Sequence, residues 1–137
     1  MTEANHAVAR RYFASLSSGA IADDLLTGDM TAWTTSSGVQ SDKARYCFGV
    51  NLLASIFSEG PTYTIDSLTA EEDRVAAEVR MRGTLVNGEP YHNVYMFMLR
   101  IRDGRIASVA EHFDPVPVRE KLGPLLQAAM AKTASKG

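Results

Sequence analysis

Two residues of opposite charge lie close together in an alternating stretch of the chain. Glu78 and Arg80 are two residues apart, so on a strand both side chains point to the same face. If that face lines a cavity, Arg80 can orient a catalytic carboxyl or an anionic intermediate beside Glu78. If it faces solvent, Glu78 pairs with Arg80 or Arg82 and stabilises the fold by only about a few tenths of a kcal/mol. The spacing fits both interpretations.

Two further pairs of polar residues are adjacent in sequence. His92 is a candidate general base because imidazole titrates near neutral pH, although a lone strand histidine is more often structural or exposed. Neighbouring strand residues point to opposite faces, so either His92 or Asn93 faces a cavity. Glu111 and His112 also point to opposite faces, and we expect no direct dyad between them.

Other kinds of chemistry have no sequence signal. The three histidines lack ligand spacing, and no glycine-rich phosphate loop or nucleophilic serine motif is present. Cys47, between Tyr46 and Phe48 on an expected helix, is interpreted as a small buried hydrophobic residue. If the protein is an enzyme, we therefore expect it to use neither a metal nor an organic cofactor.

Composition narrows the class of protein. The chain has 137 residues, 45% of them hydrophobic, and a net charge of −2, which is typical of a globular domain and argues against bulk nucleic-acid binding. A single cysteine favours a reducing compartment. The N-terminus does not resemble a secretory signal, and no apolar run is long enough to cross a bilayer, so we expect a cytoplasmic protein without membrane contact.

Hydrophobic periodicity predicts helices first and strands afterwards. Apolar spacing of three and four predicts helices over 2–16 and 41–58, the second ended by Gly60-Pro61, with a short turn at 22–26 and a strand at 30–35 between them. Alternating residues then predict four strands, with turns at Glu72-Asp73, Asn87-Gly88 and Asp103-Gly104. Asp114–Pro117 ends the last strand, and a C-terminal helix follows over 118–132, with a tail at 133–137.

This order predicts an α+β domain spanning 1–137, with its core at about 5–117. Consecutive strands joined by tight turns form an antiparallel meander, and the helices cover one face of it. Because both strand faces carry many apolar side chains, we expect the other, convex face to pair with a second copy as a homodimer.

Three segments carry a resemblance to a known superfamily. They are the helix Val8–Gly19, the short strand around Trp33, and the run Ile101–Ile106 before Glu111-His112-Phe113-Asp114. In this order, over about 5–117, they resemble SnoaL-like and ketosteroid-isomerase-like proteins of the nuclear transport factor 2 superfamily. The resemblance implies a cone-shaped α+β barrel in which a strongly curved mixed or antiparallel sheet wraps around the N-terminal helix and leaves a cavity.

The resemblance also implies roles for particular residues. Tyr12 takes the place of the hydroxyl with which ketosteroid isomerase stabilises an enolate, although Tyr12 also fits the apolar stripe of its helix. That enzyme's base falls near Thr34 and its second donor near Met96 or Phe97, which argues against its full mechanism. In the related epoxide hydrolase, the catalytic acid/base falls on Glu111, and an arginine–aspartate pair falls near Glu78 and Arg80 with the charges exchanged.

These expectations lead to a candidate function. The catalytic candidates are Glu111, Arg80, Tyr12, Glu78 and His92. An aromatic lining is expected from Trp33, Tyr46, Phe57, Tyr95 and Phe97, together with Asn93, and it favours a small apolar or aromatic substrate. Isomerisation, epoxide hydration, aldol cyclisation and a lyase step all remain open. The alternative is a ligand-binding or dimerisation module without catalytic activity.

Overall fold

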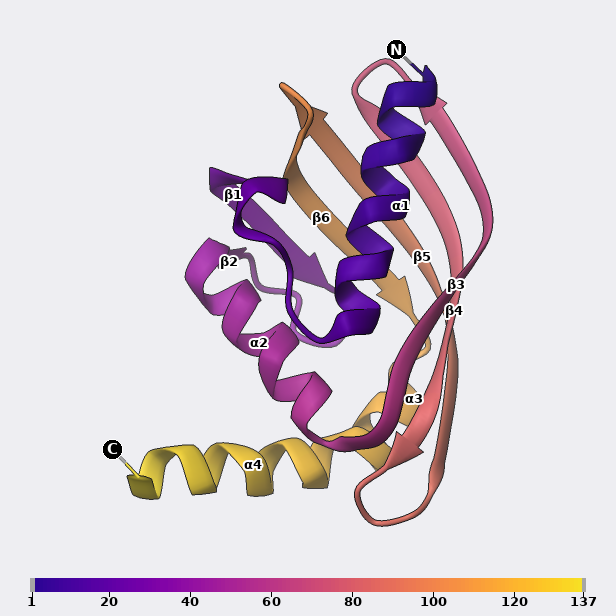
Figure 1. Ribbon diagram of the computed structural model, residues 1–137. Helices are drawn as coiled ribbons and strands as arrows, with labels where there is room; N and C mark the ends of the chain where they lie inside the picture. The colour runs from indigo at the N-terminus through magenta and orange to yellow at the C-terminus, as the bar shows by residue number, and fades with distance from the viewer. Residues whose placement is uncertain (1, 137) are drawn as a thin grey trace.

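A strongly curved sheet of six strands forms the frame of the structure, a computed structural model that describes residues 2–136 and the side chains of 2–134 (Figure 1). The strands are β1 (Leu26–Thr34), β2 (Ser41–Asp42), β3 (Phe57–Glu71), β4 (Arg74–Leu85), β5 (Pro90–Arg102) and β6 (Arg105–Phe113). The helices are α1 (Thr2–Ser18), α2 (Lys43–Ser55), α3 (Pro115–Pro117) and α4 (Gly123–Lys136), with a short turn at Asp23–Leu25 and a wider helical turn at Val118–Leu122. This α+β cone, with its C-terminal helix, confirms the predicted fold class.

The strand order in the sheet is β2-β1-β6-β5-β4-β3. The four strands β3 to β6 form the predicted antiparallel meander. β1 joins it in parallel beside β6, so that Thr34 lies next to Glu111. The sheet is therefore mixed, and the end of β1 lies beside the C-terminal end of β6, the last strand of the meander.

α1 lies along the concave face of the sheet (Figure 1). Its apolar stripe, which includes Tyr12, Phe13 and Leu16, is buried in the same core as Phe97 and Leu99 of β5. α1 ends at Ser18, two residues beyond the predicted end, and Gly19 follows as a left-handed residue with φ of 88°. The sequence pattern thus identified the buried face of this helix and placed its end within two residues.

The start of β3 differs from the prediction. The helix was expected to run to Ser58 and end at Gly60-Pro61, but α2 ends at Ser55, and Gly60-Pro61 lies inside β3. The β3–β4 register shifts on both sides of Glu59, so the proline sits at an irregularity where its missing N–H breaks no regular ladder. β3 is also an edge strand, a position that tolerates proline.

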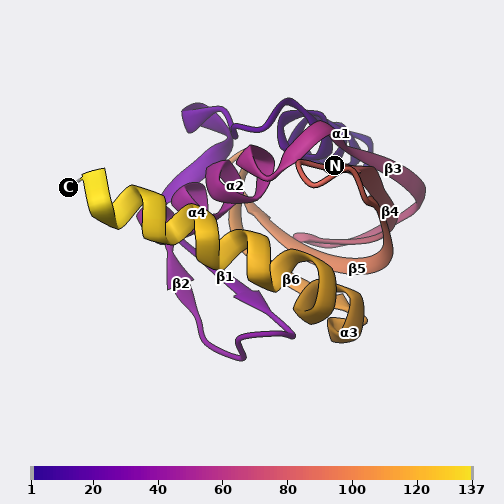
Figure 2. The same ribbon diagram turned by 90° about the horizontal axis from the view of Figure 1, so that it is seen from below.

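The C-terminal segment becomes helical earlier than expected. Asp114 caps α3 by accepting a hydrogen bond from the Val116 N–H at 3.0 Å, and Pro115 occupies the first helical position. Helical structure then continues through most of the expected tail to Lys136, while Gly137 lies outside the described residues. Figure 2 shows α4 crossing the lower end of the curved sheet. No helix within residues 2–136 is long and apolar enough to span a membrane.

The outer face of β5 carries exposed apolar side chains. Val94 is 55% exposed and Met96 is 42% exposed. We expect two copies to pair through this face, because burying apolar surface favours association. Light scattering should give the mass of a dimer, and Val94→Glu should give a monomer, whereas Val39→Glu in the β1–β2 loop should remain dimeric. A monomeric native chain at micromolar concentration would contradict this expectation.

Candidate functional site

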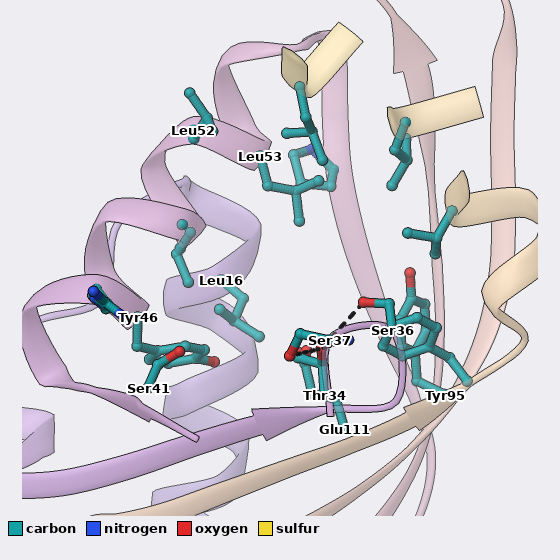
Figure 3. A pocket seen from close by; sticks show the side chains of 18 of the residues that line it. Leu16, Thr34, Ser36, Ser37, Ser41, Tyr46, Leu52, Leu53, Tyr95 and Glu111 are labelled. Carbon is teal, nitrogen blue, oxygen red and sulfur yellow. Dashed lines mark hydrogen bonds between the residues drawn. The ribbon is translucent and has the colours of Figure 1, made fainter. Parts of the chain in front are cut away.

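A pocket of about 340 Å³ lies between α2, the C-terminal segment and the inner face of the sheet. Its volume is within the range of about 300–1,000 Å³ that is usual for small-molecule sites. One wall is apolar and includes Leu16, Val50, Leu53, Val118, Leu122 and Leu126. The other carries hydroxyl groups and the charged residues Arg45 and Glu111. In Figure 3, Thr34, Ser37 and Glu111 lie together, away from Leu52 and Leu53.

Glu111 is the acidic residue of this pocket. It projects from β6, where the register places it beside Thr34 of β1 and opposite Phe97 of β5. Among residues 2–136 its carboxyl group has no hydrogen-bond or ion-pair partner, and burial raises its pKa to about 7. A carboxyl with this pKa exists in both protonation states near neutral pH and can accept or donate a proton.

Tyr46 places a hydroxyl group in the same pocket. It comes from the second turn of α2 and hydrogen-bonds to the hydroxyl of Tyr12, which is fully buried behind it. Burial, and then the charge of Glu111, raise the pKa of Tyr46, so the phenol stays neutral and keeps its proton for donation. Tyr12, which was expected to act directly, does not line the pocket, whereas Tyr46 does.

A second hydroxyl is held by a hydrogen-bond chain along β5. Tyr95 lines the pocket, and its hydroxyl lies 3.0 Å from that of Tyr91. The Asn93 side-chain nitrogen donates to the Tyr91 hydroxyl and to the Asp114 carbonyl, both at 3.1 Å. Tyr91 accepts from Asn93, and either tyrosine hydroxyl can donate to the other, so the chain fixes the place of the Tyr95 hydroxyl in the pocket.

The structure places several expected catalytic residues outside the pocket. Arg80 is on the outer face of β4, with its side chain 47% exposed, and pairs with Asp66 at 2.8 Å. Glu78 is on the same outer face and accepts a hydrogen bond from Ser67. Their expected place in the cavity is therefore wrong, because the alternate residues of β4, from Val75 to Met81, occupy the inner face. His92 is exposed on the outer face of β5 and does not line the pocket.

Of the expected ligand-binding residues, Tyr46 and Tyr95 line the pocket, and four others do not. Trp33 stacks against His112 on the outer face of the sheet, with ring centres 5.1 Å apart. Phe57 and Phe97 are buried core residues that pack on Tyr91 and Phe13, respectively. Asn93 is buried and holds Tyr91 and Asp114, so it supports the site without lining it.

Sequence reasoning missed several lining residues. Tyr63 lines the pocket from β3, and its alternation with Ile65 was the available signal. Ser36, Ser37, Ser41 and Arg45 come from the β1–β2 loop, β2 and the start of α2. No periodic pattern marks such a segment, because its contribution depends on how the loop folds over the end of the sheet.

Comparison with known proteins identifies the family. A model of the SnoaL-like domain matches residues 9–109. The chain belongs to the SnoaL-like family. No curated protein matches the sequence.

Solved structures share the SnoaL-like fold at low sequence identity. IdmH of Streptomyces antibioticus, proposed to be a polyketide cyclase, has a TM-score of 0.73 and 21% identity over 87% of this chain and 98% of its own. An NTF2-like protein of Anabaena variabilis has a TM-score of 0.73 and 24% identity, covering 82% and 88%. A proposed isomerase of Bacillus subtilis has a TM-score of 0.73 and 20% identity, covering 89% and 94%. At these sequence identities, the similarity shows a shared fold and nothing more specific.

The pKa of Glu111 has a consequence for stability. The folded state holds this proton up to about pH 7, whereas the unfolded chain releases it near about pH 4.3, so stability is lost as pH rises through this window. Glu111→Gln removes the cost of burying a charged carboxylate, which the native protein bears at high pH. The free energy of unfolding of the variant, relative to that of the native protein, should therefore rise by about 2–3 kcal/mol between pH 5 and pH 8, measured by urea denaturation.

The matched control is Glu78→Gln, which removes a carboxyl from the outer face of the same sheet. Its effect on unfolding should not grow in this way. A stability difference for Glu111→Gln that is constant from pH 5 to pH 8 would show that the carboxyl is not held near neutrality by burial.

Proposed function

We propose that this protein is a small-molecule enzyme in which Glu111 transfers a proton on an apolar cyclic or aromatic substrate. The observation that carries the proposal is a carboxyl group without an ionic partner, with a pKa of about 7, in a pocket that also presents the hydroxyl groups of Tyr46 and Tyr95. Acid/base catalysis is most efficient when the pKa of the catalytic group is near the working pH.

The chemistry follows from the two kinds of group. Ionised Glu111 removes a proton from a carbon next to a carbonyl, and the carbonyl oxygen becomes an enolate. Neutral Tyr46 or Tyr95 donates a hydrogen bond to that oxygen as its negative charge develops. Protonated Glu111 then returns the proton to another carbon, giving an isomer. Alternatively, the enolate carbon attacks a second carbonyl of the same molecule, and Glu111 gives the proton to the alkoxide that forms, giving an aldol ring.

The apolar wall supports this assignment. Leucine and valine side chains from α1, α2 and the C-terminal segment face the polar groups across the pocket. They accommodate a ring system and keep water away from the carboxyl, which maintains its raised pKa. Fold relatives include a proposed polyketide cyclase and a proposed isomerase, and proton transfer next to a carbonyl is common to cyclisation and isomerisation of this kind.

Glu111→Gln should abolish most of the activity. A substrate is first identified by screening the native protein against a panel of aromatic and terpenoid epoxides, enones and hydroxylated aryl ketones. We expect Glu111→Gln to lower kcat/KM by about 10²–10⁴-fold, because general acid–base groups contribute in that range. For the native enzyme, kcat/KM should rise with pH to a plateau, with an apparent pKa of about 7, as Glu111 loses its proton.

Glu78→Gln and Arg80→Ala serve as controls, because both residues lie on the outer face. These variants should keep native activity and the native pH profile. Turnover that survives Glu111→Gln would remove this residue from the mechanism, and ligand binding without any turnover would favour the non-catalytic alternative.

The two hydrogen-bonded tyrosines should differ in their effects. Tyr46→Phe removes a donor that faces the pocket, and we expect kcat to fall by about 10²-fold or more. Tyr12→Phe removes the hydroxyl behind it, so kcat should fall less, by about tenfold, with KM unchanged. Steady-state kinetics on both variants measure this order. A larger loss of kcat in Tyr12→Phe than in Tyr46→Phe would contradict it.

A further inference from the structure

The hydroxyl-bearing wall of the pocket ends in a positive charge. Arg45 lines the pocket from the first turn of α2. Its position is fixed by its backbone, because the Arg45 N–H donates to the Asp42 carboxylate at 2.9 Å. Asp42 in turn pairs with Thr31 in the short β1–β2 ladder, so the start of the helix is anchored to the sheet.

The guanidinium group of Arg45 has no partner within residues 2–136. Other arginines do: Arg11, Arg80 and Arg102 each pair with an aspartate on the surface. At the start of α2, the Asp42 carboxylate is engaged by the Arg45 backbone N–H, and the Asp23 carboxylate pairs with Lys43 at 3.0 Å. Arg45 is thus an exposed residue at the border of the pocket, and its side-chain donors are uncommitted.

Arg45 and Glu111 are the two charged residues among the described residues that line the pocket. They do not form an ion pair, and burial alone accounts for the raised pKa of Glu111. A guanidinium in contact with this carboxyl would lower its pKa instead. The pocket thus has two separate polar ends, one that transfers protons and one that carries a positive charge.

Serine hydroxyls line the same pocket. They belong to Ser36, Ser37 and Ser41, and Ser41 is held by its pairing with Ala32 of β1. Thr34 connects to Ser36 and Ser37 through hydroxyl contacts of 3.2 and 3.4 Å. In Figure 3, Ser41 lies beside Tyr46, while Thr34, Ser36 and Ser37 lie near Glu111. Of these serines, Ser41 is the one on the α2 side of the pocket, where it can add a hydroxyl donor for a ligand oxygen near Arg45.

We propose that Arg45, assisted by Ser41 and its neighbouring hydroxyls, binds a carboxylate of the substrate, so that the substrate is an apolar ring compound carrying one acidic group. The planar guanidinium donates two parallel hydrogen bonds that match a carboxylate. A dianionic phosphate fits less well, because a single cation would leave one charge uncompensated in a pocket that already contains Glu111. This assignment deepens the proposed function and rests on it for the role of Glu111.

The consequence for the reaction is a fixed orientation of the substrate. With the acid at Arg45 and the ring against Leu53, Leu122 and Leu126, the reacting carbon is directed toward Glu111. Holding a substrate by two ends is an established way of lowering the entropic cost of reaching the transition state. Arg45 would therefore determine which substrates are turned over, without taking part in proton transfer.

Binding of two matched probes tests the proposal. 2-Naphthylacetate and its neutral amide, 2-naphthylacetamide, have the same ring and differ in charge. Isothermal titration calorimetry with the native protein should show the acid binding at least tenfold more tightly. Arg45→Gln should weaken binding of the acid to the level of the amide and leave the amide unchanged, and Arg45→Lys should keep part of the preference.

Arg10→Gln is the control, because it removes an exposed arginine from α1, outside the pocket. It should keep the full preference for the acid, and so should Glu111→Gln, whatever that variant does to turnover. Equal affinity for the two probes, no binding of the acid at millimolar concentration, or a preference that survives Arg45→Gln would each overturn the assignment. If Glu111→Gln keeps its turnover while Arg45→Gln loses the preference, the proposed reaction fails and the acid site stands.

Discussion

The packing of α1 into the concave face of the sheet determines most of what lies around it. Phe13 meets Phe97 edge to face, with ring centres 4.9 Å apart, and the Tyr63 N–H donates to the Ser17 hydroxyl at 3.0 Å. Phe97 is the cross-strand partner of Glu111, so the contact that anchors the helix also removes water from one side of the carboxyl. Beyond the end of α1, the inner face is left to α2 and the C-terminal segment, and the pocket lies there.

Charge is distributed unequally between the two faces of the sheet. The outer face and the loops carry ion pairs such as Arg80 with Asp66. Solvent around such pairs reduces both the desolvation cost of the charges and the contribution of the pair to stability. On the inner face, Glu111 is the one carboxyl among the described residues that line the pocket, and it lies among phenols and apolar side chains. Phenols suit such a site because burial keeps them protonated, so they add hydrogen-bond donors without adding charge.

Much of the fold could be predicted from local pattern, but the site could be predicted only in part. Alternation identified β4 to β6 and their turns, since each strand has one buried face. The same alternation says which side chains share a face but not which face encloses a cavity, so it could not decide whether Glu78 and Arg80 face the cavity or the solvent. The sequence pattern predicts that Pro61 ends a helix. The register irregularity that lets β3 contain this proline depends on pairing with β4, which the local pattern around Pro61 does not show. The place of Arg45 depends on the β1–β2 ladder, for which the sequence offers no periodic signal.

The family match ends at residue 109, and the apolar wall formed by Val118, Leu122 and Leu126 lies beyond it. Leu122 is also buried against Ile56, Met81 and Tyr91 in a smaller cluster, separate from the core around α1. Replacements in this segment can thus reshape the pocket at little cost to the main core. Proteins with this architecture can therefore diverge in substrate range through changes in a short C-terminal region.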